Sequence, residues 1–370
     1  MLMLCMATYI LAACKDANTF TLTGTFTSGE QDGKIVYLRE LDSNFRVGDL
    51  VDSTLIENGV FIFKDIANDK PVVQFIVIDG TFITVAFIAE KGKIELNFDS
   101  ELRALVGGTA INDQHRLLKT EMDKIFDKTN TMGKNYEDIK SAGSLTFEQY
   151  QDNRTNFKKI GEELSNLICE FIEPNITTTV GQFFLLNNSY YIDGSKQKEL
   201  IALSTPDFQQ LEYVQKMLKQ VEFLEATAAG EPFTDVKGFD LNDKEVLLSD
   251  YVEKGKIVLV DFWASWCGPC IQAMPDMIAV YNEYNNKGFE MVGISLDDNK
   301  ENWKKATENL IITWPQMSNL KGWEEDCAVA YGINSIPQTV LIGKDGIIIE
   351  RNLDGDGLKF FLEKLLLANK

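Results

Sequence analysis

The sequence predicts an α/β fold class: a mixed sheet with helices on both faces at the C-terminus, preceded by a small antiparallel β domain and a helical segment. Three observations predict it. Apolar residues alternate over residues 19–108, stripes with a helical period fill residues 109–226, and strand-like runs alternate with helical ones over residues 228–370. The chain has 370 residues, of which 45% are hydrophobic, so two or three domains with buried cores are expected.

Residues 1–18 are expected to be a signal segment and tether. Residues 1–13 are apolar but too few to span a membrane, and two alanines precede Cys14 and a polar stretch. The pattern resembles a bacterial lipoprotein signal with its lipobox, although no positive charge precedes Lys15. An ordinary apolar strand or helix is the alternative. On the first reading, the mature chain begins at an acylated Cys14, is lipid-anchored and faces an oxidising compartment.

Residues 19–108 are predicted to be β-rich. Phe20, Leu22 and Phe26 alternate with threonines, which is typical of a strand with one buried face. Asn58-Gly59 stands between two apolar runs and predicts a β-hairpin. A small antiparallel sheet or sandwich is expected, without a recognisable catalytic constellation. Its further strands are predicted at 72–78, 82–89 and 93–98.

Residues 109–226 are predicted to be helical. Thr146 and Gln149 have the spacing of a capping box, and a long apolar stripe follows them. A second helix, with Pro206 in its first turn, is expected to run to about Leu224. Both apolar stripes are interpreted as core or inter-domain contacts rather than as a cofactor site.

Strands and helices are predicted to alternate over residues 228–370, after a candidate linker at 226–232 and a hairpin over 236–248. This order, which ends in a second hairpin, predicts a mixed sheet covered on both faces. Strands are expected at 257–260, 289–295, 339–342 and 347–350, and helices at 271–285, 300–310, 324–331 and 356–368.

Two cysteines lie between the strand at 257–260 and the helix at 271–285. Cys267 is therefore expected at a helix N-terminus, where unpaired N–H groups and the helix dipole favour a thiolate. A fall of its pKa from about 8.5 to about 7 would raise the thiolate fraction at neutral pH from a few per cent to about half. Cys270, one turn further along, is close enough to attack a mixed disulfide formed at Cys267. We expect Cys267 to attack and Cys270 to resolve.

Composition argues against several other kinds of site. The net charge is −20 and no basic cluster stands out, which argues against a nucleic-acid partner. The single histidine, His115, excludes a multi-histidine metal site and is interpreted as a surface residue on a helix. Only one pair among the six cysteines has CxxC spacing, which favours redox chemistry over zinc, so no metal or cofactor is expected. Cys169 and Cys327 are interpreted as small buried apolar residues, and a bridge between them is left open.

The run Val260-Asp-Phe-Trp-Ala-Ser-Trp-Cys-Gly-Pro-Cys270 resembles the active site of thioredoxin. The region from about residue 228 to 370 resembles the TlpA/ResA branch of the thioredoxin superfamily, which contains membrane-tethered bacterial thiol–disulfide oxidoreductases. The β-rich region is similar in order and size to the domain of unknown function that precedes many TlpA-like lipoproteins. The resemblance implies a thioredoxin fold at the C-terminus. Residues 288–297, 331–337 and 345–346 add to it.

The same resemblance implies roles for residues around the two cysteines. Pro337 is expected in the cis form opposite the sulfur atoms, with the backbone of Ile336 free to pair with an extended substrate. A trans-proline in a plain loop is the alternative. Trp266 is expected on the exposed substrate surface, and Trp263 is expected to be structural. The other tryptophans are interpreted as packing residues: Trp303, Trp314 and Trp323.

Asp261 is expected to lie buried beneath the active site. Thioredoxin has an aspartate at the matching position, so the resemblance implies that Asp261 accepts the proton of Cys270. A buried carboxyl group has a raised pKa, which suits proton exchange near neutrality. The alternative is a buried aspartate that is satisfied by hydrogen bonds and has no kinetic role. Many TlpA/ResA-like proteins have a glutamate three residues after the second cysteine, where this chain has Ala273. This departure favours proton handling through Asp261.

The expected function is that of a cell-envelope thiol–disulfide oxidoreductase, facing the periplasm or the cell surface. The Gly-Pro pair between its cysteines resembles reducing thioredoxins more than strong oxidants. Expected partners are disulfide-containing protein substrates, an upstream thiol electron donor and the membrane, through the lipid anchor. One alternative is a thiol peroxidase-like antioxidant, but the threonine and proline that usually activate a peroxidatic cysteine are missing upstream of Cys267. Another is a surface binding lipoprotein with the thioredoxin fold as scaffold, although a scaffold needs neither thiol.

Overall fold

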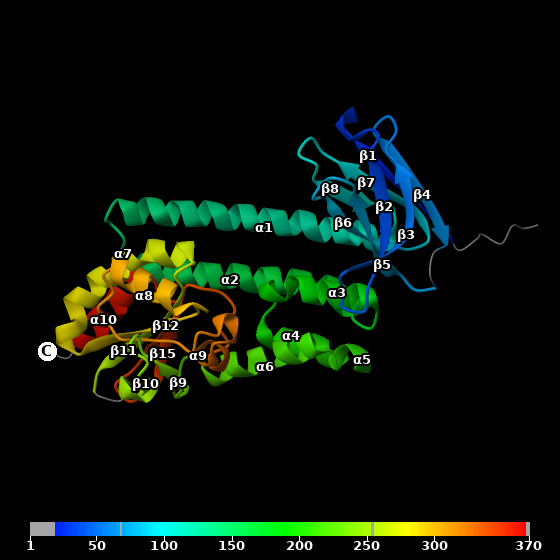
Figure 1. Ribbon diagram of the computed structural model, residues 1–370. Coiled ribbons are helices and arrows are strands. Elements are labelled where there is room, and N and C mark those ends of the chain that lie inside the picture. The colour runs from blue at the N-terminus through cyan, green and yellow to red at the C-terminus, as the bar shows by residue number, and fades with distance from the viewer. Residues whose placement is uncertain (1–18, 67–68, 253–254, 368–370) are drawn as a thin grey trace, which may run out of the picture. The chain divides into compact units, whose positions relative to one another are not determined.

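The computed structural model describes residues 19–66, 69–252 and 255–367 (Figure 1). Along the chain, a group of strands comes first, a run of helices follows, and strands alternate with helices in the last third. This is the order that the sequence predicts. Among the described residues, no helix is both long and apolar enough to cross a membrane.

The chain divides into two compact units. The first contains the chain up to Glu137 and Asn156–Gln209, and the second contains Asp138–Thr155 and the chain from Gln210 onward. The division falls within two long helices, α1 and α2, each of which contributes residues to both units. These helices span Ala110–Ser141 and Phe147–Ile172.

The first unit contains two four-stranded β-sheets that share one hydrophobic core. The strands are β1 (Thr19–Phe26), β2 (Ile35–Leu41), β3 (Val47–Leu55), β4 (Val60–Ile66), β5 (Val72–Ile78), β6 (Thr84–Ala89), β7 (Gly92–Phe98) and β8 (Ala104–Gly107). Their orders are β4-β1-β7-β8 and β3-β2-β5-β6. Leu22 and Leu96 of one sheet and Val36 and Ile76 of the other are all fully buried in the shared core. The predicted sandwich is therefore present.

Two details of the predicted β domain are wrong. The Asn58-Gly59 turn exists, with φ angles of 53° and 73°, and closes one antiparallel bridge between Glu57 and Val60, but β3 and β4 do not continue it as a hairpin. Instead, β3 pairs with β2 in one sheet and β4 pairs with β1 in the other, because Ile56 and Phe61 on either side of the turn are buried in the core that both sheets share. In addition, β1 and β7 run parallel, so their sheet is mixed rather than antiparallel.

The helices after the sandwich begin and end largely where local signals place them. The Thr146 N–H donates to Gln149 Oε1 (2.9 Å) and the Gln149 N–H donates to Thr146 Oγ1 (3.2 Å), which confirms the predicted capping box of α2. The prediction of a single helix that begins at Pro206 is wrong. The backbone is extended at Leu211 (ψ 134°), and this residue separates α5 from α6. The later helices are α3 (Thr179–Asn188), α4 (Gly194–Leu203), α5 (Pro206–Gln209) and α6 (Glu212–Ala226).

His115 of α1 is a packing residue and not the surface residue expected. Its ring centroid lies 4.6 Å from that of Phe184 on α3 and 5.9 Å from that of Phe171 on α2. Burial, with a smaller contribution from the Lys119 ammonium group, lowers the pKa of the imidazole to about 4. His115 is therefore neutral at pH 7.

The second unit is built on a five-stranded mixed sheet of order β13-β12-β11-β14-β15. Its strands are β11 (Ile257–Trp263), β12 (Phe289–Ser295), β13 (Gln316–Met317), β14 (Gln338–Ile342) and β15 (Ile348–Arg351). The central strand β11 runs parallel to β12 and antiparallel to β14. All 7 residues of β11 are buried, so both faces of the sheet are covered at its centre, as predicted. The sequence does not predict β13, since two residues carry no periodicity.

Helix α7 follows β11 directly and packs against β12 and α10. The predicted hairpin ahead of the sheet is confirmed as a two-stranded antiparallel pair, β9 (Lys237–Phe239) with β10 (Glu245–Leu247). The main helices of this unit are α7 (Gly268–Tyr284), α8 (Lys300–Asn309), α9 (Asp326–Ala330) and α10 (Gly355–Leu362).

Two helical glycines of the first unit should respond oppositely to alanine. A Cβ atom at Gly181 would lie 2.3 Å from the backbone carbon of Asn175, so Gly181→Ala should lower the free energy of unfolding by about 1–3 kcal/mol. A Cβ atom at the exposed Gly161 meets nothing within 4 Å, so Gly161→Ala should raise it by about 0.5–1 kcal/mol. Urea unfolding of both variants measures this, and shifts of equal sign would contradict the packing described.

Candidate active site

Cys267 occupies the N-cap position of α7, as expected. The strand β11 ends at Trp263, a short turn follows, and Gly268 and Pro269 begin the helix. The Cys270 N–H donates to the Cys267 sulfur at 3.1 Å. A helix N-terminus presents unpaired N–H groups and the positive end of the helix dipole, so a negative charge on this sulfur is favoured.

Cys267 and Cys270 are joined by a disulfide bond, and their Cα atoms lie 5.3 Å apart. Both residues are buried, with exposed fractions of 4% and 2%. The structure thus shows the oxidised form of the pair. Cys169 and Cys327 are free and buried, and they do not bridge each other.

The Ile336–Pro337 peptide bond is cis, as expected, and its loop lies against the disulfide. The carbonyl oxygen of Ile336 is 3.8 Å from the Cys267 sulfur. Among the described residues, no backbone group forms a hydrogen bond with the N–H of Ile336 or with its carbonyl. An extended chain that approaches Cys267 can therefore find unpaired backbone groups here.

The turn between β11 and α7 is held by Asp297, a residue whose role sequence reasoning missed. Its buried carboxylate accepts hydrogen bonds from the Ser265 N–H (3.0 Å), from the Ser265 hydroxyl and from the Ser295 hydroxyl (2.6 Å). Ser265 lies two positions before Cys267, so these bonds fix the entry to the helix. The only available signal was the position of Asp297 just after a buried strand.

Asp261 and Cys270 line the same cavity of about 170 Å³. The volume is large enough for water molecules, which need about 10–15 Å³ each on the same measure. Asp261 lies in β11 and is 4% exposed, and within the described residues its carboxyl group has no hydrogen-bond or cationic partner. Burial raises the pKa of its carboxyl group to about 7. Other residues that line the cavity include Ala273, Met274, Pro337 and Thr339.

The tryptophans divide into buried and exposed ones. Trp263 is fully buried and its indole N–H donates to Gln316 Oε1 (2.9 Å), so it is structural as expected. Trp303 and Trp314 are buried, as expected of packing residues. Trp323 is not a packing residue, contrary to the prediction: it is 47% exposed and its ring centroid lies 6.0 Å from that of Trp266, which is 53% exposed.

Two expectations concern sites other than the dithiol. Cys14, the predicted lipidation site, lies outside the described residues. Within residues 19–66, 69–252 and 255–367, no group of three or more histidine, cysteine, aspartate or glutamate side chains is placed to hold a metal ion.

Comparisons with known proteins match both parts of the chain. Residues 229–351 match the AhpC/TSA family, and residues 20–115 match a family described as a domain of unknown function, DUF4369. Thiol-disulfide oxidoreductase ResA of Geobacillus thermodenitrificans is 32% identical over 143 residues, which are 38% of this chain and 79% of that protein. ResA of Bacillus anthracis is 33% identical over 127 residues, 34% of this chain and 70% of that protein.

Among solved structures, the thioredoxin domain of a thiol-disulfide oxidoreductase from Bacteroides vulgatus is 36% identical. The match covers 38% of this chain and 98% of that one, with a TM-score of 0.35. The likeness to the two ResA proteins spans more than two thirds of their length at more than 30% identity. This chain therefore belongs to the ResA-like thiol–disulfide oxidoreductases of the thioredoxin superfamily.

Proposed function

We propose that this protein is a cell-envelope oxidoreductase that reduces disulfide bonds of other proteins through Cys267 and Cys270. The observation that carries the proposal is the placement of the Cys267 sulfur at the N-terminus of α7, bonded to Cys270 and next to the cis peptide at Pro337. Family membership supports the same chemistry. The Gly-Pro pair between the cysteines supports the reducing direction, because it resembles reducing thioredoxins.

The reaction begins with the reduced protein. The Cys267 thiolate attacks one sulfur of a substrate disulfide, a mixed disulfide forms, and the other substrate sulfur leaves as a thiolate. The Cys270 thiolate then attacks the Cys267 sulfur, which releases the second substrate thiolate and closes the bond between Cys267 and Cys270. The substrate gains two electrons and, after its thiolates are protonated, two protons. An upstream thiol donor returns the two electrons to this protein.

Asp261 is proposed to accept the proton of the Cys270 thiol before the second attack. The two groups line one cavity, and the pKa of the carboxyl group, raised to about 7 by burial, suits proton exchange near neutrality. Ala273 lines the same cavity and carries no ionisable group. Asp354 is a second carboxylate in the lining, but its side chain accepts the Gly357 N–H (2.9 Å) as the N-cap of α10. The carboxyl group of Asp261 has no such hydrogen bond within the described residues, which favours Asp261 as the proton acceptor.

Localisation and partners follow from the N-terminal sequence and from the chemistry. We propose that residues 1–18 direct export, that Cys14 is acylated, and that the mature protein is tethered to a membrane and faces the periplasm or the cell surface. Its partners are then exported proteins with disulfide bonds and a thiol donor of the envelope. Nucleic acid is not among the proposed partners, because a protein with a net charge of −20 would repel the phosphate backbone.

The roles of the two cysteines can be separated in an insulin-reduction assay with dithiothreitol as donor. Cys267→Ser should lower the rate to that of dithiothreitol alone, since no sulfur remains to attack the substrate. Cys270→Ser should turn over more slowly, because only dithiothreitol can then resolve the mixed disulfide at Cys267. When the reduced variant is freed of dithiothreitol before insulin is added, the mixed disulfide should accumulate and be visible by non-reducing electrophoresis. Activity of Cys267→Ser equal to that of the wild type would contradict the proposal and favour a scaffold role.

Asp261→Asn should slow the second attack. General acid–base groups typically contribute about 10²–10⁴-fold, and cavity water can take over part of the role, so we expect at least about a tenfold loss. The measurement is the single-turnover rate of substrate reduction between pH 6 and pH 9, started from reduced protein. Asp298→Asn changes an exposed carboxylate outside the cavity and is the matched control. Unchanged rates of Asp261→Asn across this pH range would remove Asp261 from the mechanism.

The same variant should change how stability depends on pH. Asp261 has a pKa of about 7 when folded and about 3.9 when unfolded, so folding binds a proton and stability is lost as the pH rises from about 4 to about 7. Asp261→Asn removes this loss. Relative to the wild type, the oxidised variant should gain roughly 2 kcal/mol in free energy of unfolding between pH 5.5 and pH 8.5.

The difference between the two pH values is the quantity to measure, because any cost of burying the asparagine amide is the same at both. Urea unfolding without added thiol keeps the disulfide intact, and both pH values lie above the pI of about 4.6. Asp298→Asn should show no such pH-dependent gain. A flat difference for Asp261→Asn would mean that the carboxyl group is already ionised at low pH.

A further inference from the structure

An exposed pair of tryptophans borders the redox site. Trp266 directly precedes Cys267, and the Trp323 ring lies beside it at a tilt of 55°. About half of each side chain faces solvent, although Trp is among the residues that gain most free energy from burial. Aromatic side chains left exposed beside each other are typical of binding surfaces, where they contribute much of the affinity.

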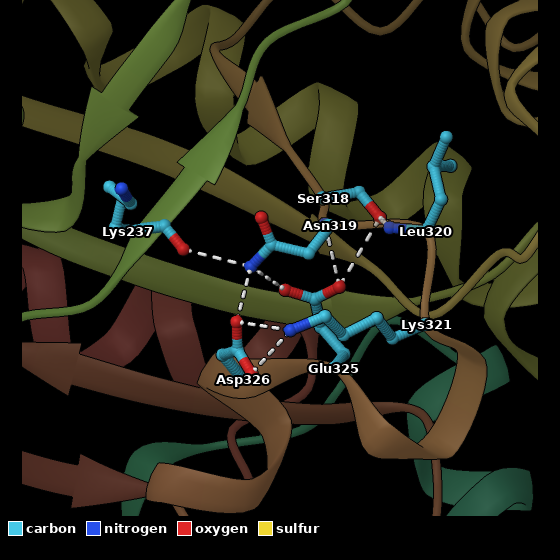
Figure 2. Close-up of polar contacts among 7 residues, drawn as sticks. All are labelled: Lys237, Ser318, Asn319, Leu320, Lys321, Glu325 and Asp326. Carbon is cyan, nitrogen blue, oxygen red and sulfur yellow. Dashed lines mark hydrogen bonds and ion pairs between the residues drawn. The ribbon is translucent and has the colours of Figure 1, made fainter.

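Trp323 lies in a short 3-10 helix, Gly322–Glu324. The residues on either side of this helix are held by a buried carboxylate, that of Glu325 (Figure 2). Glu325 is fully buried and accepts hydrogen bonds from the Asn319 N–H (2.7 Å) and from the Asn319 side-chain amide (3.1 Å). The Ser318 hydroxyl accepts from the Leu320 N–H (3.0 Å). Burial raises the pKa of Glu325, while the bonds from Asn319 oppose that rise. The carboxylate thus fixes the backbone on both sides of Trp323.

Two more contacts fix the same segment. The Asn319 amide also donates to the carbonyl of Lys237 on β9 (2.8 Å), and the Lys321 ammonium group pairs with Asp326 at 2.8 Å. Figure 2 shows these bonds converging on one small cluster. Rigid support by hydrogen bonds is what a binding residue needs, because its position must be set before the ligand arrives. These hydrogen bonds support Trp323, whose ring is about half exposed and is not part of the hydrophobic core.

The tryptophan pair is continuous with the groups that meet the substrate disulfide. Trp323 contacts Trp266, Trp266 adjoins Cys267, and the Cys267 sulfur contacts the carbonyl oxygen of Ile336. A chain that pairs with the unpaired backbone of Ile336 and places its cysteine at Cys267 therefore brings a neighbouring side chain towards the two rings. A small disulfide reaches Cys267 without extending to them.

We propose that Trp323 and Trp266 bind an apolar or aromatic side chain next to the cysteine of an extended polypeptide substrate. This inference rests on the proposed function and specifies its substrate class. The protein then prefers disulfides in polypeptide segments with an apolar residue beside the cysteine over disulfides flanked by small polar residues. Such segments are buried in folded proteins and accessible in unfolded or misfolded ones.

The test compares three substrates with the full-length protein: a peptide disulfide with leucine or tryptophan beside the cysteine, the same peptide with serine there, and bis(2-hydroxyethyl) disulfide. The wild type should favour the apolar peptide over the serine peptide by about tenfold in kcat/KM, mainly through KM. Trp323→Ala should abolish that preference and leave the rate with bis(2-hydroxyethyl) disulfide unchanged. Trp323→Phe should retain most of it.

Leu247→Ala is the matched control, because it removes an exposed apolar side chain of the same unit and should change none of the three rates. A wild type without preference between the peptides overturns the inference, even if the alanine variant fails to fold. Equal losses of Trp323→Ala on all three substrates overturn it as well, since they indicate a general structural defect. A wild type that reduces none of the substrates would contradict the proposed function itself.

Discussion

The complete burial of β11 is the constraint on which the functional part of this structure depends. The strand lies at the centre of its sheet, hydrogen-bonded to β12 on one side and to β14 on the other, and all 7 of its residues are buried. Its end is therefore fixed, and so is the start of α7 that carries Cys267. Asp261 belongs to the same strand, so its carboxyl group is buried as well, and in the part of the chain that the structure describes it has no hydrogen-bond or cationic partner.

Local signals in the sequence were sufficient for most elements and for the reacting groups. Alternation, helical periodicity, the capping box at Thr146 and the CxxC spacing each act within a few residues, so the sequence alone predicts them. Strand partners and exposed surfaces are decided by contacts between distant segments. The Asn58-Gly59 turn links two sheets because Ile56 and Phe61 beside it are buried in their shared core. Trp323 is exposed in a segment that the hydrogen bonds between Asn319 and the buried Glu325 hold in place. Neither the strand pairing around this turn nor the exposure of Trp323 can be predicted from the periodicity of apolar residues.

Glu325 and Asp261 are two of the buried carboxyl groups near the redox site, and their surroundings differ. Glu325 receives hydrogen bonds from the backbone and side chain of Asn319, so a change in its protonation would disturb the segment around Trp323. Asp261 has no such bonds within the described residues and faces a cavity that can hold water. A group without fixed partners can gain or lose a proton with little rearrangement. Glu325, which has a structural role, is fixed by hydrogen bonds, whereas Asp261, which is proposed to exchange a proton, is not.

The bond between Cys267 and Cys270 closes a ring of only four consecutive residues at the first turn of α7. Crosslinks stabilise proteins mainly by restricting the unfolded chain, and they do so less as the closed loop becomes shorter. Forming this bond therefore restricts the unfolded chain only slightly. Opening and closing it should change the free energy of unfolding of the whole protein far less than a crosslink between distant segments would.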